Sequence, residues 1–141
     1  MEFLYRAMAE EGGLPKLGSS ATTLGVRKGK DIDVDDAGDC LRPDFFRGER
    51  NGVSCTPSVV DLPEFAMPQD WGGANPRTRI WRIRRVELGP KLIAELDKPG
   101  HVSIGPCLKM SFLEFVQAIQ RTAPFWELVA VESRTQNESE K

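Results

Sequence analysis

One segment near the carboxyl end has clear helical spacing, and its isolation limits the folds open to this 141-residue chain. Its apolar side chains recur at Phe112, Phe115, Val116 and Ile119. Gln117 and Gln120 can face water, so the spacing predicts a helix that begins after Ser111 and buries one face. The other periodic segments are short. Few helices and several short strands predict an α+β domain.

Short strands are expected at several places along the chain. Segments with strand composition lie at residues 2–7, 80–88 and 101–104. Residues 80–88 carry apolar and charged side chains on both faces, which predicts a strand partly covered on each side. Residues 125–131 fit either a final strand or an extension of the helix after Pro124. A brief helix over residues 21–26 is predicted to begin after Ser19 or Ser20 and to end at Gly25.

The length of the chain is that of one compact domain. Hydrophobic residues make up 40% and charged residues 28%, the balance of an ordinary globular protein. We expect a single domain over residues 1–132 and a disordered tail over residues 133–141, which contain no apolar anchor. Residues 57–76 are rich in Pro and Gly, and so long an irregular stretch indicates a functional surface.

Charge and hydropathy bear on the compartment and on possible partners. The net charge of −2 offers no field that would attract a phosphate backbone, which disfavours nucleic acid as a partner. The chain has neither a polybasic block nor an apolar run approaching the roughly 20 residues that span a bilayer, which disfavours a membrane. Its first residues lack the pattern of a signal peptide. We therefore expect the protein to act in the cytoplasm.

No metal site is expected. Cys40, Cys55 and Cys107 are too far apart for a zinc motif and odd in number, so they are interpreted as free thiols. The acidic run over residues 31–39 fails as a calcium loop, because its sixth and twelfth positions hold Asp36 and Arg42. Short carboxylate side chains favour turns without any ion, so the run is interpreted as an acidic turn.

His101 is the single histidine and lies in a segment bracketed by Pro99-Gly100 and Gly105-Pro106. Histidine is the side chain that most readily changes charge near neutral pH, so His101 is a candidate ligand-facing group; the alternative is a structural or merely exposed side chain.

An Asn-Gly turn leads into a strand whose alternation puts Ser54 and Thr56 on one face. Their hydroxyls either bind a polar ligand or are solvated at a hairpin edge. The chain has no Gly-x-Ser-x-Gly elbow, and only one histidine could serve as a base, which disfavours a serine hydrolase.

Arg6 and Glu114 each allow two interpretations. Arg6 interrupts an apolar strand, where a guanidinium needs a structural carboxylate, a group of carbonyls or solvent, or else a ligand phosphate. Glu114 lies on the predicted helix, close enough in sequence to His101 to be considered as a catalytic acid. However, Ser111-Phe112-Leu113-Glu114 also matches a capping box, in which Glu serves the helix terminus.

Taken in order, several of these segments resemble the small ADP-ribosyltransferase-like toxins delivered by bacterial type VI secretion. The resemblance runs over about residues 3–120 and rests on Leu4-Tyr5-Arg6-Ala7, Asp31-Ile32 with Gly38 and Pro43, Gly52-Val53-Ser54, His101-Val102-Ser103-Ile104-Gly105-Pro106, and Met110 before a helix.

The resemblance implies an ADP-ribosyltransferase-like fold, with a mixed, split and bent sheet, few short helices and a cleft that binds NAD as substrate. Arg6, with Tyr5 beside it, matches the residue that contacts the dinucleotide. Ser54, with Val53, matches the hydroxyl residue that braces the cleft. His101 matches the histidine that opens the later strand motif. The implied reaction is attack on the ribose carbon that loses nicotinamide, through an oxocarbenium-like transition state.

The resemblance further implies a toxin that enters a target cell, modifies a macromolecular acceptor there and is neutralised by an immunity protein in the producer. Residues 61–75 are a candidate surface for that protein. Transferases of this fold place a catalytic Glu late in the chain, and the candidates here are Glu114, Glu127 and Glu132. A non-enzymatic binding module that keeps the fold is therefore the alternative function.

Overall fold

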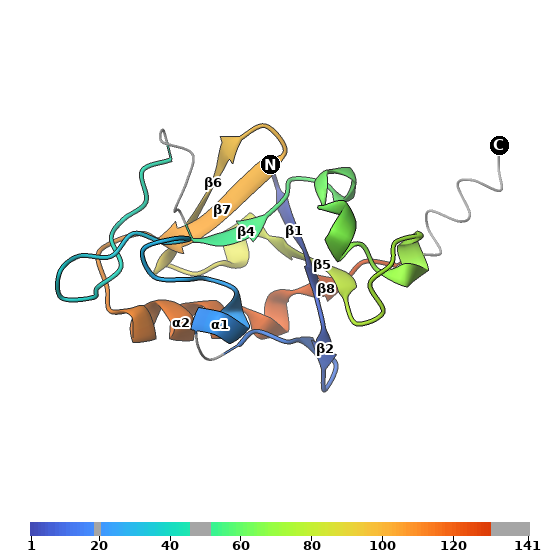
Figure 1. Cartoon of the computed structure of the whole chain (residues 1–141), viewed down its shortest axis with the longest axis horizontal. Helices are drawn as coiled ribbons and strands as arrows, with labels where there is room; N and C mark the ends of the chain where they lie inside the picture. Colours follow the sequence, from blue (N-terminus) through green and yellow to red (C-terminus); the bar gives the residue numbers. More distant parts are fainter. Residues whose placement is uncertain (19–20, 46–51, 131–141) are drawn as a thin grey trace.

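The computed structural model, which describes residues 1–18, 21–45 and 52–130, is organised around three small antiparallel sheets (Figure 1). The first has the order β1–β5–β8, with β1 at Phe3–Met8, β5 at Arg79–Arg84 and β8 at Glu127–Leu128. The second has the order β4–β7–β6, with β4 at Val53–Cys55, β7 at His101–Pro106 and β6 at Leu92–Lys98. A two-stranded hairpin is formed by β2 at Glu10–Glu11 and β3 at Leu14–Pro15.

In the described residues, two α-helices and several 3-10 turns connect these strands. The helices are α1 at Ala21–Leu24 and α2 at Phe112–Gln120. The 3-10 turns are η1 at Val59–Asp61, η2 at Glu64–Ala66, η3 at Gln69–Trp71, η4 at Arg85–Glu87 and η5 at Ala123–Phe125. Gly25 follows α1 with a φ of 76°, a left-handed conformation that ends the helix at little steric cost.

One backbone contact joins the two larger sheets. Tyr5 and Thr56 exchange both of their backbone hydrogen bonds, each 2.9 Å long. This isolated bridge connects β1 to the strand end that follows β4. Because β1 and β4 separate beyond it, the combined sheet is split at this point.

The core lies between α2 and one face of the sheets. Helix α2 buries Phe115, Val116, Ala118 and Ile119. These side chains belong to one apolar cluster with Val102 and Ile104 of β7 and with Leu4 and Ile83 of the first sheet. Trp81 is buried in the same cluster and donates its indole N–H to the Met8 carbonyl, 3.0 Å away. We call this the inner face of the sheets and the opposite one the outer face.

The α+β fold predicted from the sequence is confirmed. The opening strand, the strand at His101 and the helix after Ser111 lie where they were expected. The predicted strand over residues 80–88 ends at Arg84 and continues as η4. The described part of this stretch, residues 125–130, forms neither a long strand nor a helix: η5 ends at Phe125, and β8 then pairs with β5 through Glu127 and Leu128.

Strand β6 was not among the sequence predictions. Ser19, Ser20, Asn51 and the tail over residues 133–141 lie outside the described residues. None of the helices in the described part of the chain is long and apolar enough to cross a membrane.

Candidate functional site

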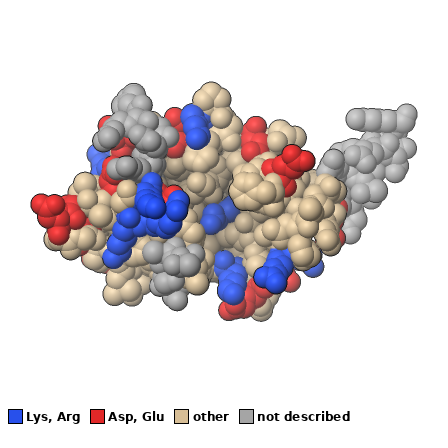
Figure 2. All heavy atoms as spheres, viewed as in Figure 1, with Lys and Arg blue, Asp and Glu red and all other residues tan. Residues whose placement is uncertain are grey.

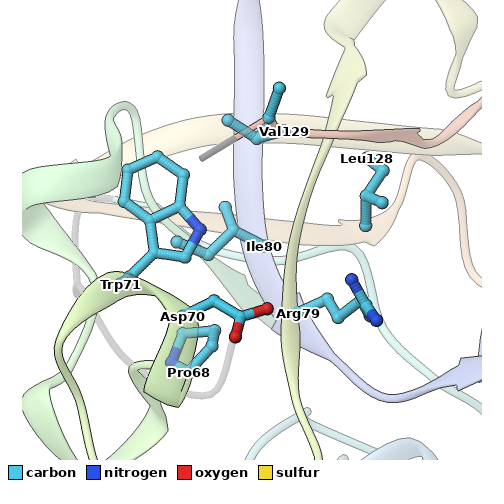
Figure 3. Close-up of a pocket in the computed structure, with 8 residues that line it drawn as sticks. Pro68, Asp70, Trp71, Arg79, Ile80, Leu128 and Val129 are labelled. Carbon is cyan, nitrogen blue, oxygen red and sulfur yellow. The ribbon is translucent and has the colours of Figure 1, made fainter. Parts of the chain in front are cut away.

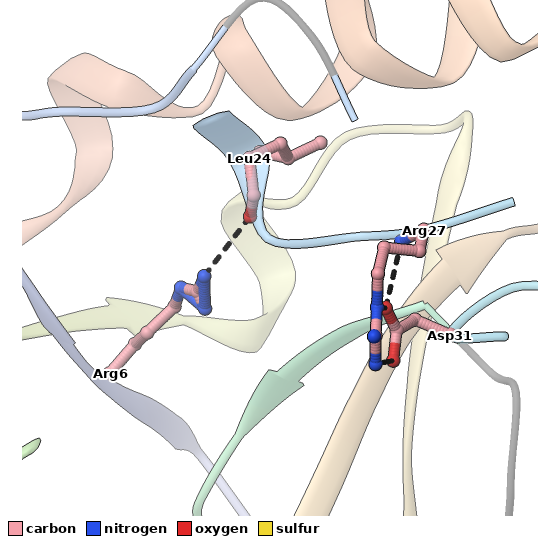
Figure 4. A network of polar contacts seen from close by, with 4 residues as sticks. All are labelled: Arg6, Leu24, Arg27 and Asp31. Atoms are coloured by element: carbon pink, nitrogen blue, oxygen red, sulfur yellow. Dashed lines mark hydrogen bonds and ion pairs between the residues drawn. The ribbon is translucent and has the colours of Figure 1, made fainter. Parts of the chain in front are cut away.

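Arg6 occupies the fork between β1 and β4 (Figure 4). Its Nη1 donates to the Ser54 carbonyl and its Nη2 to the Leu24 carbonyl, both at 3.2 Å. Backbone groups two residues apart on a strand point the same way, so the Ser54 carbonyl is directed toward β1 just as that of Thr56 is. Because β1 has already diverged there, the Arg6 side chain replaces the missing backbone donor. Arg6 thus links β1, β4 and α1.

These two carbonyls do not neutralise the positive charge of Arg6. The side chain is half-buried, and its buried Nε atom has no hydrogen-bond partner. Within the described residues no carboxylate forms a salt bridge with it. Burial raises the pKa of the neighbouring Cys55 thiol to about 12, and the charge of Arg6 only partly opposes that effect. The guanidinium is therefore a partly buried cation that contacts carbonyl oxygens, which is an arrangement suited to an anionic ligand.

A second polar cluster lies where β6 turns into β7. The Asp97 carboxylate holds two side chains: His101 Nδ1 lies 2.6 Å from Oδ1, and Ser103 Oγ donates to Oδ2 at 2.7 Å. The Asp97 side chain is 1% exposed and that of His101 is 25% exposed. A neutral imidazole with a carboxylate at Nδ1 carries its proton there, so its Nε2 is the atom available to accept a hydrogen bond from a ligand.

A β-bulge puts Asp97 in this position. Leu96 pairs with Val102 and Lys98 with His101, so Asp97 is the extra residue of β6. A β-bulge changes the direction in which the side chains of the bulged strand point. The sequence prediction missed Asp97, although its spacing from His101 across Lys98-Pro99-Gly100 is that of two residues that flank a hairpin turn.

The cluster does not have the geometry of a hydrolytic triad. In such a triad the serine donates to the imidazole, whereas Ser103 donates to Asp97 and is 3% exposed. Ser54, which is exposed, lies directly opposite Ser103 in the β4–β7 register. The site therefore offers the exposed Ser54 hydroxyl and one oriented imidazole for binding rather than an activated nucleophile.

Strand alternation separates the predicted site residues onto two faces. Arg6 shares the inner face with Leu4 and Met8, both buried in the core. Tyr5 lies on the outer face, opposite Arg82 in the β1–β5 register. Ser54 and His101 also lie on the outer face, because the residues next to them in sequence, Val53, Cys55 and Val102, are buried in the core. The fork brings Arg6 to the backbone of Ser54, but no described contact joins Arg6 to His101.

Val53 and Glu114, two of the predicted site residues, make contacts that belong to the fold. The Val53 side chain is buried in the core, so only its backbone could face a ligand, and Val53 is paired with Ile104. Glu114 donates its backbone N–H to the Ser111 hydroxyl at 3.1 Å, which is the Ser111 half of the predicted capping box; no described hydrogen bond joins the Glu114 carboxylate to the Ser111 N–H. Its carboxylate lies 3.9 Å from Lys91 Nζ, in the exposed pair that α2 forms with the start of β6. No described contact brings Glu114 to His101.

The acidic run over residues 31–39 forms turns. Asp35 Oδ1 accepts from the backbone N–H groups of Ala37 and Asp39, and Asp35 Oδ2 lies 2.7 Å from Lys109 Nζ. Arg27 holds Asp31 in the same way, with two donors 2.8 Å from Oδ2 (Figure 4). The described residues contain no group of His, Cys, Asp and Glu side chains that could hold a metal ion.

Lys109 and the Asp39 N–H lower the pKa of the Asp35 carboxyl. A depressed folded-state pKa adds stability above the unfolded value of about 3.9, and that stability is lost as the pH falls through the folded value. We therefore expect the urea midpoint to fall between pH 5 and pH 3 by less in Asp35→Asn than in the wild type. Asp36→Asn, at an exposed neighbour, is the control and should keep the wild-type slope. Identical slopes in all three proteins would contradict the expectation.

Comparisons with known protein families, with curated proteins and with solved structures found no match to this chain.

Proposed function

We propose that this protein is a bacterial toxin that transfers ADP-ribose from NAD to a macromolecular acceptor. The observation that carries the proposal is the Arg6 guanidinium, half-buried in the fork between β1 and β4 without a described carboxylate partner. A diphosphate supplies the negative charge that this site lacks. The motif order of the sequence, from Arg6 through Ser54 to His101, agrees with this assignment.

The chemistry of Arg6 suits a dinucleotide. Carbonyl oxygens carry only partial negative charge, so the two that Arg6 contacts satisfy its N–H groups but leave its net charge uncompensated. A charge-assisted hydrogen bond to phosphate is about twice as strong as a neutral one. In this proposal Arg6 anchors the diphosphate from the inner face, whereas Tyr5 lies on the opposite face of β1 and the Val53 backbone is paired with β7, so neither is assigned to that contact.

The remaining residues have positioning roles. In the proposed reaction the bond between the ribose carbon and the nicotinamide nitrogen breaks, and nicotinamide leaves. The acceptor forms the new bond to that carbon and loses a proton. His101, oriented by Asp97, contacts the ribose or a phosphate through Nε2, and Ser54 braces the cleft. Asp97 is too buried to reach a substrate, and Glu114 is paired with Lys91, so neither is assigned as the acid.

The biological setting of the proposal follows from the same resemblance. The toxin acts in the cytoplasm of a target cell, which it enters by secretion. A cognate immunity protein neutralises it in the cell that produces it.

Incubation with labelled NAD and a bacterial lysate should release nicotinamide and label an acceptor. Direct titration with NAD should show binding that Arg6→Lys weakens at least tenfold, because an ammonium cannot reproduce the planar fork. Arg77→Lys, at an exposed loop position, should leave the affinity unchanged. Circular dichroism establishes that each variant is folded. Equal affinities for both variants, or no nicotinamide release under conditions where the protein arrests growth, would overturn the proposal.

The second candidate is a binding module that keeps the fold without catalysis. The engagement of Glu114 with Lys91 and the absence of a described acid beside Arg6 favour it. Growth arrest in cells that express Ser54→Ala or His101→Ala separates the two functions. An enzyme should lose toxicity and NAD turnover together, whereas a binding module should keep its toxicity in both variants.

A further inference from the structure

The segment between β4 and β5 exposes large apolar side chains on consecutive 3-10 turns. Val60 on η1 is 89% exposed, and Phe65 on η2 is 83% exposed. Trp71 on η3 is partly exposed. Side chains this apolar leave water favourably, at about 25 cal/mol for each Å² that is covered. We call Val60, Glu64, Phe65, Asp70 and Trp71 the turn surface.

The backbone beneath the turn surface is held in place by its own hydrogen bonds. Gln69 N donates to the Asn75 carbonyl at 3.0 Å, and Asn75 N donates to the Met67 carbonyl at 3.1 Å. The Thr78 hydroxyl, at the entry to β5, donates to the Ala66 carbonyl at 2.9 Å. The turns are thus tied to one another and to the first sheet, so a partner would not have to order this segment on binding.

Two hollows flank Trp71. One, of about 440 Å³, is bounded by Trp71, Asp70, Arg79 and Ile80 (Figure 3). The other, of about 700 Å³, lies between Trp71 and Phe65. Both are open to solvent and lined largely by apolar side chains. The turn surface therefore combines a projecting Phe65 side chain with recesses, and this shape can accommodate the side chains of another protein.

Carboxylates are the charged side chains of this segment as far as Arg77. Residues 52–76 contain Asp61, Glu64 and Asp70 and no Lys, Arg or His, although the whole chain has 19 Lys and Arg residues. Figure 2 shows red and tan atoms over these turns. Glu64 and Asp70, both exposed, place carboxylates next to Phe65 and Trp71. The acidic rim repels nucleic acid and anionic membranes, and it opposes the pairing of two identical copies through this surface.

We propose that the turn surface binds a protein partner whose Lys or Arg side chains surround an apolar pocket that takes Phe65. The basic groups of the partner meet Glu64 and Asp70, and its apolar side chains enter the hollows beside Trp71. This interaction needs neither NAD nor Arg6, so it stands apart from the proposed catalytic function.

Photo-crosslinking identifies the partner. The full chain is expressed in the producing cell with p-benzoylphenylalanine at position 65 or, as a matched control, at position 86, where Val86 is 86% exposed on η4. We expect a discrete heteromeric adduct from position 65 alone, with the crosslinked peptide rich in Lys or Arg. An adduct only between copies of this chain, equal adducts from both positions, or no adduct would overturn the proposal.

Binding to the purified partner then tests the chemistry. Phe65→Ser should weaken the affinity at least tenfold, and Glu64→Lys with Asp70→Lys should do the same and abolish its decrease with added salt. Val86→Ser should leave the affinity unchanged. NAD binding by all these variants should match the wild type, which distinguishes failure of this proposal from failure of the proposed function. An affinity insensitive to both changes would overturn the assignment.

Discussion

Gly52→Ala should lower the free energy of unfolding by about 3 kcal/mol or more, because β4 could no longer approach β7. Gly52 has a φ of 122°, and a Cβ atom there would lie 2.1 Å from the Ile104 carbonyl oxygen and 2.9 Å from its carbon. Strand β7 lies between β4 and β6, so its backbone has little room to shift. Strand β4 would have to move instead, and its pairing of Val53 with Ile104 would be lost.

Gly89→Ala is the matched control for that substitution. Its φ of 88° is also positive, so alanine is strained there too, but a Cβ atom meets nothing within 4 Å. We expect it to cost about 1–2 kcal/mol, the penalty for a left-handed conformation alone. Urea unfolding of the full chain, followed by tryptophan fluorescence, gives both values. Equal losses for the two variants would mean that the close approach of β4 to β7 contributes nothing beyond backbone strain.

Asp97→Ala should cost about 2–4 kcal/mol of folding free energy, because it leaves a buried hydroxyl and an oriented imidazole without their common acceptor. Ser103 is 3% exposed and donates to Asp97 at 2.7 Å. Asp97→Asn should cost less, since its amide oxygen can still accept one of the two hydrogen bonds. Asp36→Ala, at an exposed turn position, should change the unfolding free energy by less than about 0.5 kcal/mol.

A spectroscopic measurement separates this role of Asp97 from a merely structural one. In the wild type, the ¹⁵N shifts of the neutral His101 ring should show the proton on Nδ1, where the carboxylate accepts it. In Asp97→Ala the Nε2–H tautomer, which is favoured in free imidazoles, should become populated. If the shifts were unchanged, Asp97 would not orient the ring, and the binding role assigned to Nε2 would fail.

The local elements of this protein could be predicted where a single periodicity decides them. The helix at Phe112–Gln120 follows from its apolar spacing and from the Ser111 cap, and the strands at Phe3 and His101 follow from composition and flanking turns. The end of β5 at Arg84 and the brevity of β8 could not be predicted, because strand length depends on which partner strand is available for hydrogen bonding.

The sequence analysis named several residues of the candidate site but not how they are arranged. Arg6 was identified because a charge inside an apolar strand needs a partner. One partner in the structure is the Ser54 carbonyl, and this contact depends on where β1 and β4 diverge. Asp97 was missed because a β-bulge is decided by pairing between strands.

The sequence by itself therefore determined the α+β class, the amphipathic helix at Phe112–Gln120, its Ser111 cap and the identity of the unusual polar residues. Each depends on neighbours a few positions apart, which interact through local periodicity and backbone capping. Tertiary structure alone decided the faces on which Tyr5, Arg6 and His101 lie, the fork around Arg6 and the carboxylate behind His101. These depend on strand register and on one bulge, and shifting a register by one residue moves every side chain of a strand to the other face.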